Sequence, residues 1–334
     1  MSLSVSIIIP NRNGEATIAS CLEAALATGY KNFEVIVVDD FSTDYSVEII
    51  NRYPCKLLRL EHHCGASKAR NVGAEHSSGD ILFFTDADCL LNKDTLTTAL
   101  DILSSVGPKV VLGGTYTPNP ADGSFYSFFQ SVFIHYSESQ KTPSTDYVAT
   151  HAMIINAKVF KQSGGFAEDF LPILEDVEYS HRMRRSGHRL VLNPAILVRH
   201  IFGYTLAKSM RNAFRKSMYW SAYSIANKDL LKDSGTASSG LKVNTLNWMI
   251  DALVLTLYAV TGEMLLLFSL IIIFMINVAW NRGLLSAFYT AGGAGFFAAA
   301  MLYYLVIYPL PVAAGGITGL LRYPWLKKIM GYSN

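Results

Sequence analysis

The chain has 334 residues, of which 51% are hydrophobic and 16% charged, and its formal net charge is +2. This composition is too apolar for an ordinary soluble protein, and so small a net charge gives no support to nucleic-acid binding. The four cysteines show no C-x-x-C spacing, which favours reduced thiols of a cytosolic domain over a zinc site or a disulfide frame. The amino-terminal segment lacks the basic region of a signal peptide, so we expect no leader.

Strand-like and helix-like segments alternate along the first part of the chain. Short runs of β-branched and aromatic residues predict strands at 5–9, 33–38, 56–60 and 81–85. Apolar residues at helical spacing and N-capping residues predict helices at 18–26, 42–53 and 66–76. This alternation predicts an α/β fold with a mostly parallel sheet that is covered by helices on both faces.

Polar and acidic residues follow the predicted strands where each strand ends. Asn11 and Asn13 follow the first strand, Asp39 and Asp40 end the second, and Asp86 and Asp88 end the fourth. Ligands of such sheets bind beyond the carboxyl ends of the strands, so these groups should border one crevice. The chain has neither a G-x-G-x-x-G nor a G-x-x-x-x-G-K-[ST] loop, which gives no support to a dinucleotide fold or a P-loop.

The D-A-D sequence at Asp86 and Asp88 is the most informative of these groups. Acids at i and i+2 of an extended segment point the same way, so the two carboxylates converge on one space. Such a pair can hold Mg²⁺ or Mn²⁺, which keeps its other positions for water and phosphate oxygens.

Six motifs in fixed order resemble those of family 2 glycosyltransferases with the GT-A fold, from Ser4 to His200. They are S-I-I-I-P-N-R-N-G, E-V-I-V-V-D-D-F-S-T-D, G-A-S-K-A-R-N-V-G-A, S-G-D-I-L-F-F-T-D-A-D, G-G-F and L-E-D-V-E-Y-S-H-R-M-R-R-S-G. The resemblance implies inverting transfer of a sugar from a nucleoside-diphosphate donor, here a UDP-linked one, with the help of a divalent metal, Mn²⁺ or Mg²⁺. A non-catalytic subunit that only binds sugar nucleotides is the interpretation from another class, and the intact acids argue against it.

The resemblance also implies roles for individual residues. Asp40 is expected against the base and ribose of the nucleotide, and Asp88 is the expected principal metal ligand. Asp86 is expected to contact the ribose or, through water, the metal. Further residues expected to contact the nucleotide sugar are Pro10, Asn11, Asn13, Asp39, Arg70 and Asn71, although Arg70 and Asn71 can equally be a surface arginine and an ordinary helix residue. His200 is the expected histidine at the metal or diphosphate, with a purely structural histidine as the alternative.

Glu175 and Asp176 stand where a helix should begin. Acids are common in a first helical turn for dipole reasons alone, which is the alternative interpretation. Neighbours at i and i+1 do not face each other on a helix, so the two do not form a dyad that shares a proton. In the resemblance Asp176 is the catalytic base that takes the proton of the acceptor hydroxyl, while Glu175 braces the structure.

Two apolar stretches, 248–280 and 284–321, are each long enough to cross a bilayer. Basic residues precede the first stretch and follow the second, so the positive-inside rule places both flanks in the cytoplasm and the loop 281–286 outside. Gly262-Glu263 and the Pro309/Pro311 pair are positions where these helices can break or kink. A basic amphipathic helix and a Ser/Gly-rich link precede them. We therefore predict a GT-A domain over 1–204, an interfacial helix and linker over 205–245, and a transmembrane hairpin with a cytoplasmic tail over 246–334, in the plasma (inner) membrane.

The acceptor follows from this placement, because an enzyme held at the bilayer is expected to use a lipid-borne acceptor and to build a cell-envelope glycan. The Glu175-Asp176 motif favours a hydroxyl of a lipid or lipid-linked glycan, which needs a general base. A polyprenyl phosphate is already an anion and needs none, and it is the second candidate acceptor. A processive polysaccharide synthase is less well supported, because the chain has no Q-x-x-R-W motif.

Overall fold

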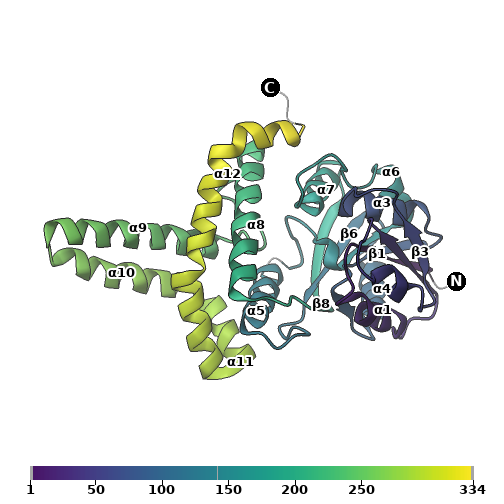
Figure 1. Cartoon of the computed structure of the whole chain (residues 1–334), viewed down its shortest axis with the longest axis horizontal. Helices are drawn as coiled ribbons and strands as arrows, with labels where there is room; N and C mark the ends of the chain where they lie inside the picture. The colour runs from purple at the N-terminus through teal and green to yellow at the C-terminus, as the bar shows by residue number, and fades with distance from the viewer. Residues whose placement is uncertain (1–2, 141, 332–334) are drawn as a thin grey trace. The chain divides into compact units, whose positions relative to one another are not determined.

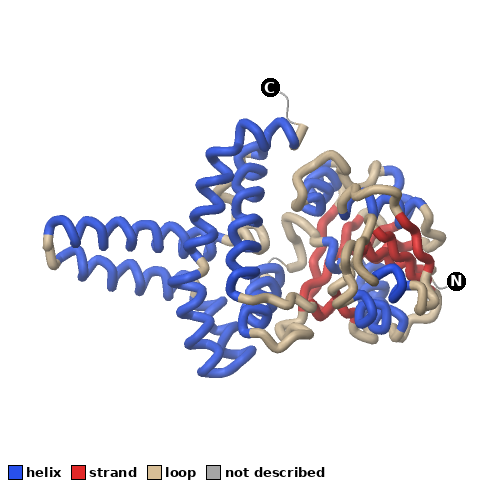
Figure 2. Tube along the Cα trace, in the orientation of Figure 1, coloured by secondary structure: helices blue, strands red, loops and turns tan. Residues whose placement is uncertain are grey.

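The computed structural model of the chain describes residues 3–140 and 142–331. It consists of two compact units. Figure 1 shows the whole chain, coloured by residue number. The sheet unit runs to Gly123 and resumes from Glu138 to Gly203, and the helical unit comprises Ser124–Ser137 and the chain from Tyr204 onward. Figure 2 shows all the strands in the first unit and only helices and loops in the second.

The sheet unit is built on eight strands in the order β3-β2-β1-β4-β7-β6-β8-β5. Their bounds are β1 Val5–Asn11, β2 Phe33–Asp39, β3 Lys56–Arg59, β4 Ile81–Phe84, β5 Cys89–Leu91, β6 Val110–Tyr116, β7 Met153–Asn156 and β8 Arg189–His200. The helices of this unit are α1 Ile18–Leu26, α2 Ser46–Ile50, α3 Ala66–Glu75, α4 Thr95–Val106, α6 Ala157–Gln162 and α7 Glu175–Arg185. The four strands predicted from the sequence are confirmed as β1 to β4, and the predicted helices at 18–26 and 66–76 as α1 and α3.

The sheet is mixed rather than mostly parallel throughout. Strands β1 to β4 are parallel to one another, as predicted, but β7 is antiparallel to both β4 and β6, and β5 is antiparallel to β8. Because β7 reverses the direction between β4 and β6, the carboxyl ends of β1, β2, β4, β6 and β8 meet at one edge of the sheet. The predicted functional residues of these strands therefore gather at that edge.

A buried aromatic cluster fixes α6 and α7 against the sheet below the site. The ring of Phe84 in β4 lies 5.0 Å from Phe160 and 5.3 Å from Phe166, and Tyr179 of α7 lies 4.9 Å from Phe166. All four side chains are at most 2% exposed. Packing of this kind holds the start of α7 in a fixed place relative to the end of β4, because buried aromatic side chains resist displacement.

The helical unit holds most of α5 Phe125–Ser139, then α8 Leu206–Asn227, α9 Ser239–Thr261, α10 Leu265–Trp280, α11 Arg282–Leu302, a π-helical turn Tyr303–Ile307 and α12 Pro309–Ile329. Within the described residues, two helical stretches are long and apolar enough to cross a membrane, Ser239–Thr261 and Arg282–Ile329. Length and composition alone make this weak evidence for a membrane span.

The prediction that 248–280 forms one span is wrong in its helix count. Gly262 adopts φ +72°, a left-handed conformation in which its N–H bonds to the Tyr258 carbonyl and ends α9. The chain then reverses into α10, so this stretch forms two helices that contact each other. The break lies at Gly262-Glu263, one of the positions where the sequence allowed a break or kink. The second stretch, 284–321, continues from α11 through the π-helical turn into α12, with a break at Gly293.

Helices α8 and α12 approach closely through two glycines of α12. A Cβ atom added at Gly315 would lie 2.3 Å from the Phe214 carbonyl oxygen, and one at Gly319 would lie 2.3 Å from that of Met218. Small residues four apart let two helix backbones touch, as they do in membrane helix pairs. Ser217 adds a hydrogen bond from its hydroxyl to the Val312 carbonyl at 2.7 Å.

We expect Gly319→Leu to destabilise the α8–α12 pair, because the new side chain meets backbone that cannot move aside. The expected cost is about 1–3 kcal/mol of unfolding free energy, typical of an overpacked contact. Thermal unfolding of the purified full chain measures it. Gly316→Ala is the matched control, since its Cβ would lie 3.6 Å from the Ser217 and Ser221 hydroxyls. Equal melting temperatures for the two variants would contradict the close approach.

Candidate active site

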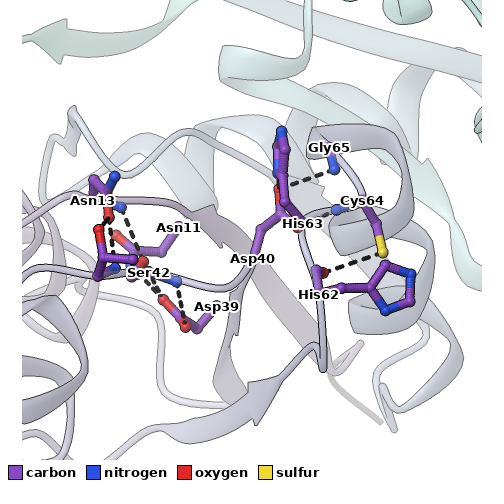
Figure 3. Close-up of polar contacts among 10 residues, drawn as sticks. Asn11, Asn13, Asp39, Asp40, Ser42, His62, His63, Cys64 and Gly65 are labelled. Carbon is purple, nitrogen blue, oxygen red and sulfur yellow. Dashed lines mark hydrogen bonds and ion pairs between the residues drawn. The ribbon is translucent and has the colours of Figure 1, made fainter.

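The end of β1 is tied to the end of β2 by a network around Asp39 (Figure 3). Asn11 donates from its amide to Asp39 at 3.0 Å, and the Ser42 hydroxyl donates to the same carboxylate at 2.5 Å. Asn13 bonds through its backbone N–H to the Ser42 hydroxyl and accepts from the backbone of Thr43. Pro10 lies in β1 opposite Val38. The predicted nucleotide-contacting residues of these two strands thus form one connected loop region at the carboxyl edge.

Asp40 is 3% exposed and is held by the loop that leads into α3 (Figure 3). Its carboxylate accepts from the backbone N–H groups of Cys64 and Gly65 at 2.7 and 2.9 Å and lies 2.7 Å from the His63 Nδ1. No role was predicted for His63 from the sequence. No local signal could have found it, because its partner is 23 residues away. The His63 side chain is 47% exposed, so this imidazole borders both Asp40 and the solvent.

Arg70 links the D-A-D loop to the start of α7. This side chain of α3 is buried, and its two terminal nitrogens donate to Asp86 at 2.7 Å and to Glu175 at 2.6 Å. Burial acts to raise the pKa of the Asp86 carboxyl, but the charge and hydrogen bond of Arg70 bring that pKa below its ordinary value. Asp86 therefore stays ionised, and the alternative of a surface arginine at position 70 is excluded by its burial.

Arg70→Met should lower the stability of the chain, because it leaves two partly buried carboxylates without their shared cation. Removing one partner of a buried ion pair costs about 3–5 kcal/mol, and we expect the lower end because the Asp86 side chain is 31% exposed. Thermal unfolding followed by circular dichroism gives the value. Arg59→Met, at an exposed arginine of β3, is the control. An Arg70 variant as stable as the control would show that the bridge adds nothing.

Asp88 and His200 come together with Cys89 at the same edge. The His200 Nε2 lies 3.4 Å from the Asp88 Oδ1, and one potential ligand atom from each of the three residues falls within 4.8 Å of the others. Burial raises the pKa of Asp88 above its ordinary value, and the Asp86 charge adds to this while His200 opposes it. A carboxylate suits Mn²⁺ or Mg²⁺ as a protein ligand, and an imidazole suits a transition-metal ion, so the donor set fits a divalent cation.

The ring of His200 is held between aromatic neighbours. It stacks on Phe202 with 3.9 Å between centroids and meets Tyr116 edge-to-face at 5.0 Å. Tyr116 stacks in turn on His151, with 4.0 Å between the ring centroids. The Nε2 atom of His151 lies 3.6 Å from the carboxylate of the buried Glu138. These contacts fix the orientation of the imidazole, as outer-shell neighbours of metal ligands do. Tyr116 of β6 and Glu138 of α5 carry no local signal in the sequence, because they meet β8 and the 150–152 turn only in the folded chain.

Glu175 and Asp176 occupy the first turn of α7, as expected. Leu174, which precedes them, has φ +76°, an unusual left-handed backbone for a leucine that turns the chain sharply into the helix. The Asp176 Oδ1 accepts from the backbone N–H of Val177 at 2.8 Å, and its side chain is half-buried. Glu175 bonds Arg70 and so braces the loop. The base assignment for Asp176 stays a prediction.

Asn71 holds the segment before α7. Its amide donates to the Phe166 carbonyl and to Glu168, both at 2.9 Å, and its oxygen accepts from the Phe166 N–H at 2.9 Å. Gly165 passes so close that a Cβ there would lie 2.5 Å from this oxygen. These contacts give Asn71 a structural role in the fold, and its contact with a nucleotide stays a prediction.

Comparison with known proteins supports a glycosyltransferase. Residues 6–164 match the model of "Glycosyl transferase family 2". The chain is similar to the glycosyltransferase GlyA of Streptococcus pneumoniae, 28% identical over 174 residues, which cover 47% of this chain and 25% of GlyA. It is also similar to WfgD of Escherichia coli, a UDP-Glc:α-D-GlcNAc-diphosphoundecaprenol β-1,3-glucosyltransferase, 38% identical over 87 residues that cover 25% of this chain and 34% of WfgD. The chain thus spans only a quarter to a third of the length of these two relatives.

The fold also has a solved counterpart. Mannosyltransferase PcManGT of Pyrobaculum calidifontis, solved in complex with GDP-Man and Mn²⁺, superposes with a TM-score of 0.60 over 97% of this chain and 88% of its own. At 18% identity this likeness bears on the fold, a mixed sheet flanked by helices.

Proposed function

We propose that the chain is a membrane-associated inverting glycosyltransferase that moves a sugar from a nucleoside-diphosphate donor to a hydroxyl of a lipid or lipid-linked glycan. The observation that carries the proposal is the Arg70 bridge, which joins the D-A-D loop and the Glu175-Asp176 turn into one charged site. The match of residues 6–164 to family 2 supports the reaction class. We also propose that the catalytic unit and the carboxyl-terminal flank lie on the cytoplasmic side of the membrane.

The donor is assigned to the carboxyl edge of the sheet. Asp40 and the loops around Asn11 and Asn13 would contact the base and ribose, and UDP is the proposed nucleotide. The divalent cation, Mn²⁺ or Mg²⁺, would be held by Asp88 and His200, with Asp86 at the ribose or a bound water. When bound, it neutralises the charge that develops on the diphosphate leaving group. The likeness to a protein solved with GDP-Man and Mn²⁺ is in keeping with this donor class.

Asp176 is the proposed general base. In a single displacement the acceptor hydroxyl attacks the anomeric carbon from the face opposite the departing diphosphate, and its proton passes to the Asp176 carboxylate as the new C–O bond forms. The C–O bond to the diphosphate breaks in the same step. Arg70 and the strained turn at Leu174 would hold Asp176 at a fixed place. The configuration at the anomeric carbon is therefore expected to invert.

The acceptor is proposed to be lipid-borne. WfgD, by its name, acts on a sugar linked to diphosphoundecaprenol, and this chain resembles it over 87 residues. A hydroxyl acceptor gives Asp176 a task, whereas the phosphate of a polyprenyl phosphate is already ionised. With a polyprenyl phosphate as acceptor, the second candidate, the transfer rate would therefore depend only weakly on Asp176.

The test is turnover of a panel of UDP- and GDP-sugars by the purified full chain with a membrane lipid extract and Mn²⁺. We expect consumption of one donor and a lipid product heavier by one sugar residue, with the opposite anomeric configuration. Chelation by EDTA should stop the reaction, and Mn²⁺ or Mg²⁺ should restore it. A folded chain that turns over no donor would contradict the proposal, and undiminished turnover in EDTA would contradict its metal.

A further inference from the structure

Helices α9 and α10 form an apolar hairpin that projects from the rest of the helical unit (Figures 1 and 2). Only 22% of the apolar stretch of α9 is buried inside the protein. Large apolar side chains are exposed along both helices, among them Leu253, Leu257, Val260, Leu265, Phe268 and Ile272. Val260 and Leu265, which flank the turn, are 80% and 77% exposed. Such a surface is unstable in water.

Exposed apolar side chains lie on several sides of α10. Phe274, Met275 and Ile276 are consecutive in α10 and are each about half exposed, from 49% to 65%. Successive residues of a helix are turned by about 100°, so these three point to different sides. An interface with a second protein copy would need one apolar stripe, whereas a helix that is apolar all round suits a lipid environment. The occupant that fits this surface is the interior of a bilayer.

The length of the hairpin matches deep insertion. A helix rises 1.5 Å per residue, so the turn after Thr261 lies about 20 Å from Trp248 along α9 and about 23 Å from Trp280 along α10. The two tryptophans therefore stand at similar distances from the tip. Trp favours the boundary between headgroups and hydrocarbon, and the hydrocarbon core is about 30 Å thick. With its tryptophans at one interface, the hairpin enters the core without needing to leave it on the far side.

The base of the hairpin is polar and tightly linked. Asn277 donates to Asn244 at 2.8 Å, Asn281 donates to Asn277 at 2.8 Å, and Asn244 donates to the carbonyl of Tyr304 in the π-helical turn at 2.7 Å. The Tyr304 hydroxyl closes the set by donating to Asn281 at 3.0 Å. These buried bonds hold the beginning of α9 and the end of α10 at the same end of the hairpin.

Basic residues surround the asparagine network at this end of the hairpin. Lys232 and Arg282 are exposed, and the ammonium of Lys242 donates to the Lys232 carbonyl. Two acids lie between Trp248 and Trp280: Asp251 in α9, three residues from Trp248, and Glu263 on the loop that follows Gly262. Positively charged residues at the end of the hairpin that joins the rest of the helical unit complement the anionic headgroups of a cytoplasmic leaflet.

We propose that the α9–α10 hairpin inserts tip-first into one face of an anionic bilayer and returns, so that Lys242 and residues 281–286 lie on the same side. The inference rests on the membrane association proposed above, and it replaces the external position predicted for 281–286. The inserted hairpin then takes the place of the single crossing predicted for 248–280.

Flotation of the full chain with liposomes of phosphatidylcholine and phosphatidylglycerol tests the insertion. The double variant Phe268→Asp/Ile272→Asp should lose binding by at least about 100-fold, because one Asp at the centre of an inserted helix already costs that much. Leu231→Asp is the matched control, since Leu231 is 90% exposed but lies outside the hairpin, and it should float like the wild type. Circular dichroism and the binding of UDP with Mn²⁺, measured by calorimetry, should be unchanged in all variants, which separates failed insertion from a damaged donor site.

Labelling in sealed vesicles with a membrane-impermeant maleimide tests whether the two ends of the hairpin lie on the same side of the membrane. Ser286→Cys and Leu231→Cys should be modified from the same side, as mapped by peptide mass, and Phe268→Trp should be quenched most by lipids brominated near the middle of the acyl chain. Labelling from opposite sides would overturn the proposal. Undiminished flotation of the double Asp variant would also overturn it, and dissociation of a dimer in that variant would assign the surface to a second copy instead.

Discussion

Asp88→Asn should reduce sugar transfer by about three orders of magnitude, because a metal that stabilises a leaving group contributes several kcal/mol to the rate. The amide keeps the size of the carboxylate but loses its charge, so the partner of His200 at 3.4 Å no longer offers an anionic ligand. The Mn²⁺ concentration for half-maximal rate should rise together with the loss of maximal rate. Initial rates measured over a Mn²⁺ series give both quantities.

Asp101→Asn is the control for this variant, since Asp101 is exposed on α4. It should show the wild-type rate and the wild-type Mn²⁺ dependence. An Asp88 variant with an unchanged Mn²⁺ dependence would remove this residue from the metal site. His200→Ala should shift the same Mn²⁺ curve in the same direction if the pair acts together.

Asp176→Asn should lower the rate of transfer by about 10²–10⁴-fold, the usual contribution of a general base, while donor binding stays unchanged. The reason is that the amide cannot take the proton of the acceptor hydroxyl. The rate should be measured with saturating donor, and donor affinity by calorimetry. Glu175→Gln tests the bracing role, and it should lower thermal stability because Arg70 loses a charged partner at 2.6 Å.

Asp169→Asn, in the exposed segment before α7, is the control and should behave as the wild type. If transfer by the Asp176 variant continued at an unaltered rate, the base assignment would fail. A modest loss would favour a polyprenyl phosphate as acceptor, since an acceptor that is already ionised makes little use of a base.

The part of the fold that local pattern determines was predictable from the sequence. The apolar runs that became β1, β2 and β4 are buried on both faces, and the asparagines and acids at their ends had to meet at the carboxyl edge once the strands were parallel. The antiparallel β7 was not predictable in this way. It is only four residues long, and its place between β4 and β6 depends on pairing with strands far away in the chain.

The same distinction applies to the site. Strand-end acids carry a local signal, whereas the contacts of Arg70 with Glu175 and of Asn71 with Phe166 join residues 105 and 95 positions apart. Tyr116, which meets the His200 ring from 84 positions away, was missed for the same reason. In the helical unit, the low charge between 248 and 280 indicated an apolar element, and Gly262-Glu263 indicated where it can break, but the full reversal depends on the left-handed backbone of Gly262.

The most direct test of the central claim is an experimental structure of the full chain with Mn²⁺ and the nucleoside diphosphate that the donor screen identifies. We predict an ion in contact with both Asp88 and His200 and with the diphosphate oxygens, and an Asp176 carboxylate that faces the position of the sugar. A nucleotide bound at this edge of the sheet with its ion away from Asp88, or with Asp176 turned away from the diphosphate, would contradict it.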